Sequence, residues 1–159
     1  MSTSDPHLDP LHPLARLREG PYGLYLEARR PMSRGEVVFQ LEGREVSEPN
    51  QHTIQLEEGL HYGESKGIWH LIQHACIPNL RFDIGELAMI AVREIKVGEE
   101  LNYNYNTSEW SLSAPFSCAC GLESCVGEVR GFAHLSSDER AQIRPLLTPY
   151  LQSRMSVTV

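Results

Sequence analysis

The sequence has no long apolar run, and this excludes one large class of protein. No stretch near twenty residues is continuously apolar in the 159-residue chain, whereas a membrane-spanning helix needs about that length. The first residues, MSTSDPHLDPLHP, also lack the apolar core of a secretory signal. We therefore expect an intracellular protein without membrane contact, cytoplasmic in the first instance and with the nucleus left open.

Positive charge is also scarce. The chain has 14 Lys and Arg against 21 Asp and Glu, which gives a formal net charge of −7. Because phosphate contacts need clustered Lys and Arg, this balance argues against direct binding of nucleic acid. An acidic surface attracts basic partners such as a lysine-rich segment. Taken alone, however, the charge is better explained by solubility.

Helical patterns are rare, and short apolar runs separated by turn residues dominate from residue 20 onward. Strands are predicted at residues 23–28, 36–41, 52–56, 87–92 and 101–105. Many short strands with few helices indicate a mostly β fold of several small sheets. Residues 1–15 are rich in Pro, His, Asp and Ser and are predicted to be a flexible tail. His7 and His12 lie in that tail and are more typical of solvated side chains than of metal ligands.

The C-terminal segment is the exception, because it has a helical pattern. Ser136 and Glu139 have the spacing of a capping box, so a helix is expected to start there. Pro145 interrupts it and predicts a kink or two short helices. The following apolar residues recur at helical spacing: Ile143, Leu146, Leu147, Tyr150 and Leu151. This stripe indicates a packing face, with a partner-binding helix as the alternative.

The chain has only four cysteines, and three of them are close together in the sequence. Cys118, Cys120 and Cys125 bring three thiols near one point, and Cys76 has to reach them through the fold. Four thiolates at about 2.3 Å from one zinc ion form a closed tetrahedral site. Because intracellular disulfides are rare, zinc is favoured, with buried thiols or two disulfides as the alternatives.

Four short segments form a recognisable set of motifs because they occur in a particular order along the chain. They are GPYGLY at residues 20–25, HLIQHACIPN at 70–79, GEELNYNY at 98–105 and FSCACGLESCVG at 116–127. They resemble the GWGLF, RFINHSCxPN, GEELTYDY and FxCxCGxxxCxG motifs of SET-domain protein lysine methyltransferases. The resemblance implies a SET domain over residues 16–115, a post-SET zinc motif over 116–131 and a helical segment over 132–159. It also implies a pseudoknot that brings residues 73–79 beside residues 100–105.

The same resemblance implies transfer of a methyl group from S-adenosylmethionine to a protein lysine, on a histone or another basic protein. Tyr105 matches the catalytic tyrosine of the family. Tyr103 matches the position where Tyr or Phe limits how many methyl groups fit, and a tyrosine there predicts chiefly monomethylation. His52 is either a donor near the target lysine or a half-buried strand residue.

The resemblance also implies two sets of binding residues. One structural zinc ion is expected at Cys76, Cys118, Cys120 and Cys125. Cofactor contacts are expected from Tyr22, Gly23, Gln73, His74, Tyr105 and Phe116, although Phe116 is equally well explained by packing on the zinc motif.

Two residues depart from the family pattern near the cofactor. Gln73 stands for an Asn that contacts the cofactor, and Pro21 stands for a Gly and removes one backbone N–H. These changes define an alternative function, a catalytically impaired SET-like module that binds a basic peptide.

Overall fold

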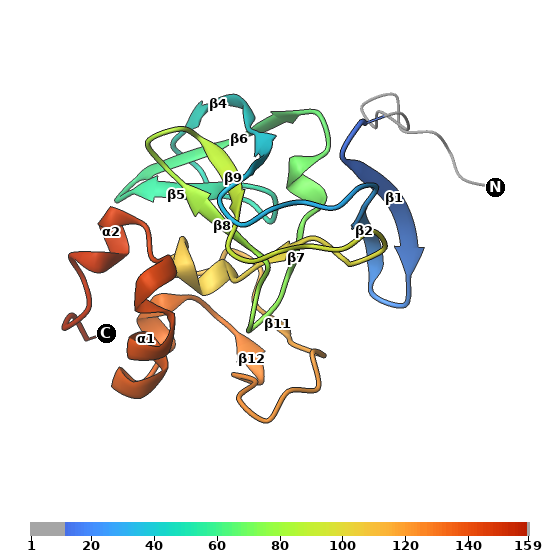
Figure 1. Cartoon of the computed structure of the whole chain (residues 1–159). Helices are drawn as coiled ribbons and strands as arrows, with labels where there is room; N and C mark the ends of the chain where they lie inside the picture. Colours follow the sequence, from blue (N-terminus) through green and yellow to red (C-terminus); the bar gives the residue numbers. More distant parts are fainter. Residues whose placement is uncertain (1–11, 159) are drawn as a thin grey trace.

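Short strands and short helices make up about half of the structure, a computed structural model that describes residues 12–158 (Figure 1). Residues 1–11, which include His7, lie outside the described part, so most of the predicted tail stays a prediction. The strands are β1 (Ala15–Gly20), β2 (Gly23–Ala28), β3 (Val37–Gln40), β4 (Glu42–Val46), β5 (Ile54–Glu57), β6 (Leu60–Lys66), β7 (Gln73–His74), β8 (Leu80–Asp83), β9 (Ala88–Ala91), β10 (Asn102–Tyr103), β11 (Phe116–Ser117) and β12 (Glu128–Val129). The helices are η1 (Trp69–Leu71), η2 (Tyr105–Thr107), η3 (Phe132–His134), α1 (Ser137–Ile143), η4 (Arg144–Leu146) and α2 (Pro149–Gln152).

Within the described residues these strands form two three-stranded and three two-stranded sheets. The three-stranded sheets have the orders β3-β9-β8 and β4-β6-β5, and the antiparallel pairs are β1-β2 and β11-β12. The remaining pair, β7-β10, is parallel. The prediction of a mostly β fold with several small sheets is therefore confirmed. No helix in the described part is long and apolar enough to cross a membrane.

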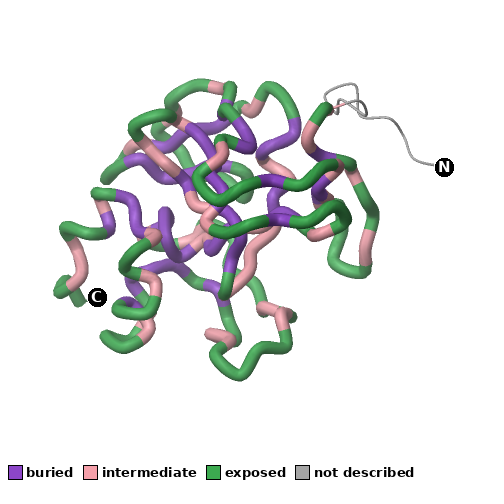
Figure 2. The backbone as a smooth tube through the Cα atoms, viewed as in Figure 1, coloured by how far each residue is buried: buried purple, intermediate pink, exposed green. Residues whose placement is uncertain are grey.

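The main core lies between these small sheets, where the buried segments of several strands meet (Figure 2). Its fully enclosed side chains are Leu26, Met32, Ile72, Leu80, Met89, Ile95 and Leu101. Burying each such side chain stabilises the fold by about 1.5–3 kcal/mol. Backbone hydrogen bonds from Leu101 to Leu26 and from Ala28 to Glu99 fasten β2 to the segment before β10. This core holds in place β7 and β10, the two strands that carry Gln73 and Tyr103.

The parallel pairing of β7 with β10 is the central feature of the topology. Gln73 faces Asn102 and His74 faces Tyr103, so residues 73–79 and 100–105 lie side by side as the predicted pseudoknot requires. Asn79 and Asn102 each donate a backbone N–H to the side-chain oxygen of the other, both at 2.9 Å. The side-chain amides of the buried Asn79 and the half-buried Asn102 thus fix the register of β7 and β10, in which only two residue pairs face each other.

The C-terminal segment follows its predicted pattern closely. Ser136 caps α1, and the capping box with Glu139 is complete. Pro145 lies in the first turn of η4, so the segment is divided into short helices, as predicted. Its apolar stripe packs inward, with Leu147 and Leu151 buried against Phe132 in a second core cluster. The packing-face interpretation is therefore supported.

The last residue of the predicted tail, Ala15, is the first residue of β1. Ala15 is 1% exposed and pairs with Ala28 at the start of β1. His12 is not a freely solvated side chain either, because its ring lies 5.1 Å from that of Phe39. The polar sequence of β1 conceals a strand that is stabilised by its pairing with β2. His52, predicted within a strand, lies exposed in the turn before β5.

Candidate functional site

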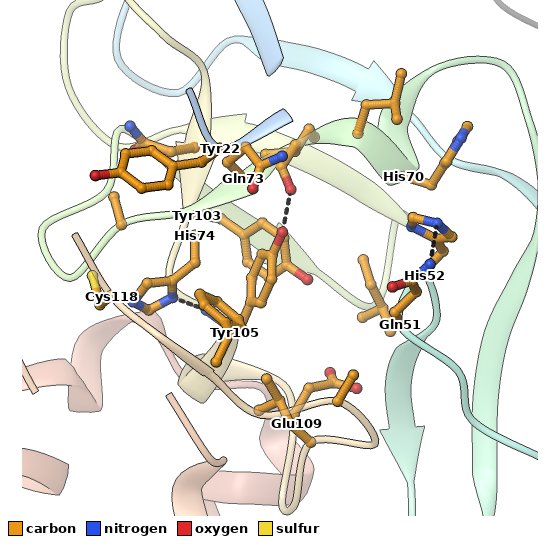
Figure 3. A pocket seen from close by; sticks show the side chains of 18 of the residues that line it. Tyr22, Gln51, His52, His70, Gln73, His74, Tyr103, Tyr105, Glu109 and Cys118 are labelled. Carbon is orange, nitrogen blue, oxygen red and sulfur yellow. Dashed lines mark hydrogen bonds between the residues drawn. The ribbon is translucent and has the colours of Figure 1, made fainter. Parts of the chain in front are cut away.

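A cavity of about 880 Å³ lies where β7, β10, η2 and the segment around β11 meet. Its size is typical of sites for small molecules and cofactors. Figure 3 shows the two tyrosines at its centre, Tyr22 and Cys118 on one side, and His52 and His70 on the other. Every residue predicted to bind the cofactor, except Gly23, lines this cavity, and both predicted catalytic tyrosines do as well.

Tyr105 projects into the cavity from the start of η2. Its hydroxyl donates a hydrogen bond of 2.5 Å to the carbonyl oxygen of Ile72, just before β7. Burial, followed by the charges of Glu109 and Glu100, raises the pKa of Tyr105 well above its usual value. The hydroxyl is therefore neutral at physiological pH, and its oxygen can still accept a hydrogen bond while its proton is donated to Ile72.

Tyr103 lies beside Tyr105, with ring centroids 4.7 Å apart. It comes from β10 and is 6% exposed, and burial is the main reason that its pKa is raised well above the usual value. Glu109 and Tyr105 raise this pKa further, while a hydrogen bond with the Ser108 side chain lowers it. The cavity centre therefore combines aromatic surface with two neutral hydroxyl groups.

His74 connects this centre to the cysteines. Its Nδ1 accepts the backbone N–H of Tyr105 at 3.0 Å, and its Nε2 lies 3.6 Å from Sγ of Cys76. Burial lowers the pKa of His74 to about 4, so the imidazole is neutral. Since Nδ1 accepts a hydrogen bond, the ring proton belongs on Nε2 and points at the sulfur. One side chain thus fixes the backbone of Tyr105 relative to a thiol.

The other predicted cofactor residues form the rim of the cavity. Tyr22 is 78% exposed on the turn between β1 and β2, and Phe116 packs edge-on against the rings of His74 and Tyr105. Gly23 has a φ of +106°, which glycine adopts readily, and a Cβ there would meet no atom within 4 Å. Gln73 donates from Nε2 to the carbonyl oxygen of Leu24 at 2.6 Å. Its amide thus ties β7 to β2 at the cavity edge.

The four cysteines meet beside this cavity. Sγ of Cys76 lies 3.8 Å from that of Cys118 and 3.9 Å from that of Cys125, and all four sulfurs lie within 4.8 Å of one another. Four sulfurs placed tetrahedrally at about 2.3 Å from zinc are about 3.8 Å apart. The donor set and its spacing therefore fit one structural zinc ion. The structure brings together all four predicted ligands.

Glu109 is a buried acidic residue of the cavity that the sequence predictions did not single out. Glu109 lies two residues after η2 and is 8% exposed. Its Oε2 accepts hydrogen bonds from the Gln55 backbone N–H at 2.9 Å and the Ser108 hydroxyl at 2.5 Å. Burial raises the pKa of Glu109 to about 7. No periodic pattern marks it, because it stands in an irregular segment between two motifs.

Comparison with known proteins identifies the family. A family model described as the SET domain matches residues 23–106, which is more than half of the chain. The chain belongs to the SET-domain family. The match includes the two tyrosines, Gln73, His74 and Cys76, and it ends before Glu109 and the three late cysteines.

Curated relatives of this SET domain are longer proteins. Methyltransferase flvH of Aspergillus flavus is 33% identical over 87 residues, 52% of this chain and 47% of that protein. A histone-lysine N-methyltransferase, H3 lysine-36 specific, of Chaetomium globosum is 28% identical over 149 residues, 79% of this chain and 16% of that protein. The chain thus spans less than half the length of these two relatives.

A solved structure shows the same fold. The crystal structure of KRYPTONITE in complex with mCHH DNA, H3(1-15) peptide and SAH superposes with a TM-score of 0.57 at 21% identity. The superposition covers 72% of this chain and 29% of that one. The SET fold of the chain is therefore established independently of its motifs.

Proposed function

We propose that this chain is an S-adenosylmethionine-dependent protein lysine N-methyltransferase. The observation that carries the proposal is a pair of neutral tyrosines, the buried Tyr103 and the half-buried Tyr105, at the centre of a ligand-sized cavity. The names of the relatives, a methyltransferase and a histone-lysine N-methyltransferase, agree with it.

The chemistry of the cavity suits an in-line displacement. Bound S-adenosylmethionine would supply the methyl group, carried on a sulfonium. The task of the protein is then to align a neutral amine with that carbon, which is mainly a matter of positioning. An enclosed aromatic channel disfavours the ammonium form of a lysine. Tyr103 and Tyr105 line the cavity, and their hydroxyl oxygens would accept weak C–H···O contacts from a polarised methyl group.

Cofactor binding is assigned to the rim residues. Tyr22 and Phe116 offer exposed aromatic surface, His74 lines the cavity, and Gly23 directly follows Tyr22 in the chain. The four cysteines are assigned to one structural zinc ion, which would order the post-SET segment that carries Phe116.

The finer assignments follow from single residues. The Tyr103 hydroxyl crowds a methylated amine, so we assign chiefly monomethylation. The substrate is a lysine in a histone or another basic protein, and a histone substrate would place the protein in the nucleus. Binding of nucleic acid forms no part of this proposal, and its expected absence stays a prediction.

One observation favours a second candidate, a SET-like module that binds a basic peptide without methylating it. Gln73 uses its amide nitrogen to bind the Leu24 carbonyl within the protein. A side chain engaged in this way contributes less to a cofactor.

A radiolabelled methyl-transfer assay on core histones and a cell extract separates the two candidates. We expect incorporation by the wild-type protein and a decrease in kcat of about 100-fold in Tyr105→Phe, because an oriented oxygen at the reacting carbon is lost. Tyr25→Phe is the matched control, since Tyr25 lies on β2 and does not line the cavity. Calorimetric binding of S-adenosylmethionine without any transfer would support the binding module. Absence of cofactor binding would refute the proposal.

A further inference from the structure

In the described part of the chain, the cavity wall has acidic side chains but no Lys or Arg. Among the described residues that line it, Glu100 and Glu109 are the carboxylates, and none is Lys or Arg. Opposite charges at close range in a partly enclosed site interact more strongly than in water. Such a cavity therefore favours ligands that carry positive charge.

Glu109 is the more deeply placed of the two carboxylates. It is 8% exposed and therefore buried, whereas Glu100, on the segment before β10, is an exposed residue. In the view of Figure 3, Glu109 lies below Tyr105 at the base of the cavity. Its negative charge acts on both Tyr103 and Tyr105 and raises the pKa of each, so it lies near both rings.

The hydrogen bonds of Glu109 leave one oxygen for a ligand. Both side-chain hydrogen bonds, from Gln55 and Ser108, go to Oε2. Within the described part of the chain no donor reaches Oε1, which is also not among the fully enclosed polar atoms. Oε2 thus anchors the carboxylate, and Oε1 remains as an acceptor on a side chain that lines the cavity.

Among residues 12–158, no Lys or Arg forms an ion pair with Glu109 or acts on its pKa. Burial raises its pKa to about 7, because a carboxylate with no cation beside it is poorly solvated there. A ligand that brings a positive charge to Oε1 would stabilise the ionised carboxylate and so offset its poor solvation. The two hydrogen bonds on Oε2 keep the group oriented without neutralising it.

We propose that Glu109 binds the ammonium group of the methyl-acceptor lysine, so that the domain selects cationic amines over neutral side chains of the same shape. The inference rests on the proposed function for the identity of the acceptor. It adds a substrate-binding residue, outside the segment that the family model matches, which engages the amine before its proton is lost.

A binding comparison of two small probes tests this role. Nα-acetyl-lysine N-methylamide and Nα-acetyl-norleucine N-methylamide differ by the ammonium group and have similar length. Titrated by NMR into the zinc-loaded protein with S-adenosylhomocysteine, the wild type should bind the lysine compound at least about tenfold more tightly. In Glu109→Gln, which keeps the shape and the acceptor oxygen, this preference should fall to about twofold or less. Glu100→Gln is the matched control, with the same charge change in the same cavity, and should retain the preference.

Several outcomes would overturn the inference. These are an equal affinity of the wild type for both probes, an unchanged preference in Glu109→Gln, or a loss of preference in Glu100→Gln alone. A decrease in melting temperature with an intact preference would show that Glu109 only links η2 to β5. If Glu109→Gln does not fold, the wild type labelled with ¹³C at its glutamate carboxyls provides a second measurement. The lysine probe should shift the Glu109 signal and the norleucine probe should not, and equal shifts would refute the role.

The same samples separate this inference from the proposed function. Calorimetry with S-adenosylhomocysteine is performed first on every variant. If the wild type binds no cofactor, the proposed function is contradicted. The affinities of the two probes can still be compared in the cofactor-free protein, and their ratio still tests the inference. Suppose that Glu109→Gln transfers methyl groups as the wild type does and prefers the lysine probe to the same extent. This result contradicts only the inference.

Discussion

The buried carboxyl group of Glu109 should make stability depend on pH in a defined direction. Burial raises its pKa from the ordinary value of 4.5 to about 7, so the protonated form is favoured in the folded state. A group of this kind contributes full stability below pH 4.5, and that contribution is lost as the pH rises through 7. The whole shift corresponds to about 3 kcal/mol, of which about 2 kcal/mol is still present at pH 5.5.

Urea denaturation at pH 5.5 and pH 8 measures this effect. Between the two values the free energy of unfolding of the wild type should fall by about 2 kcal/mol more than that of Glu109→Gln, whose side chain does not titrate. Glu123→Gln, a substitution at an exposed carboxylate, should follow the wild type. Zinc is kept saturating at both pH values, so that ligand protonation does not enter the difference. An equal pH dependence of wild type and Glu109→Gln would refute the reasoning.

Two further predictions concern the zinc site and the methyl number. Cys120→Ala should reduce bound zinc from one to well below one per chain by metal analysis and lower the melting temperature, and an unchanged zinc content would contradict the assignment. Tyr103→Phe removes a hydroxyl from the cavity centre and should shift the products toward di- and trimethyl-lysine by mass spectrometry. Wild type that already forms mostly trimethyl-lysine at low conversion would contradict this account.

The features predicted from sequence are those that local chemistry determines. The capping box at Ser136 and the strand at residues 23–28 depend on neighbours in the sequence, and both are present as predicted. The meeting of Cys76 with the three late cysteines was predicted from the family motifs, because thiols alone do not specify a path through the fold.

The features that were missed depend on tertiary contacts. β1 and β4 have polar sequences, and each is a strand because it pairs with a neighbour, β2 or β6. In β6, Gly63 weakens the alternating pattern, yet it is needed because a Cβ there would approach Thr53 within 2.7 Å. Glu109 is recognisable only once η2 has turned it toward Tyr103. Sequence periodicity carries no information about such a contact.

The walls of the cavity extend over most of the chain, from Tyr22 to Leu122. Closing contacts between such distant positions costs chain entropy before any ligand can bind, so the pocket completes late in folding. During synthesis, a ribosome-bound chain lacks a complete pocket until the cysteines after Phe116 have emerged. A fragment that ends before residue 118 retains both tyrosines and most of the main core but has one open side. A complete pocket therefore forms only after residues 22–122 have been synthesised and have folded together.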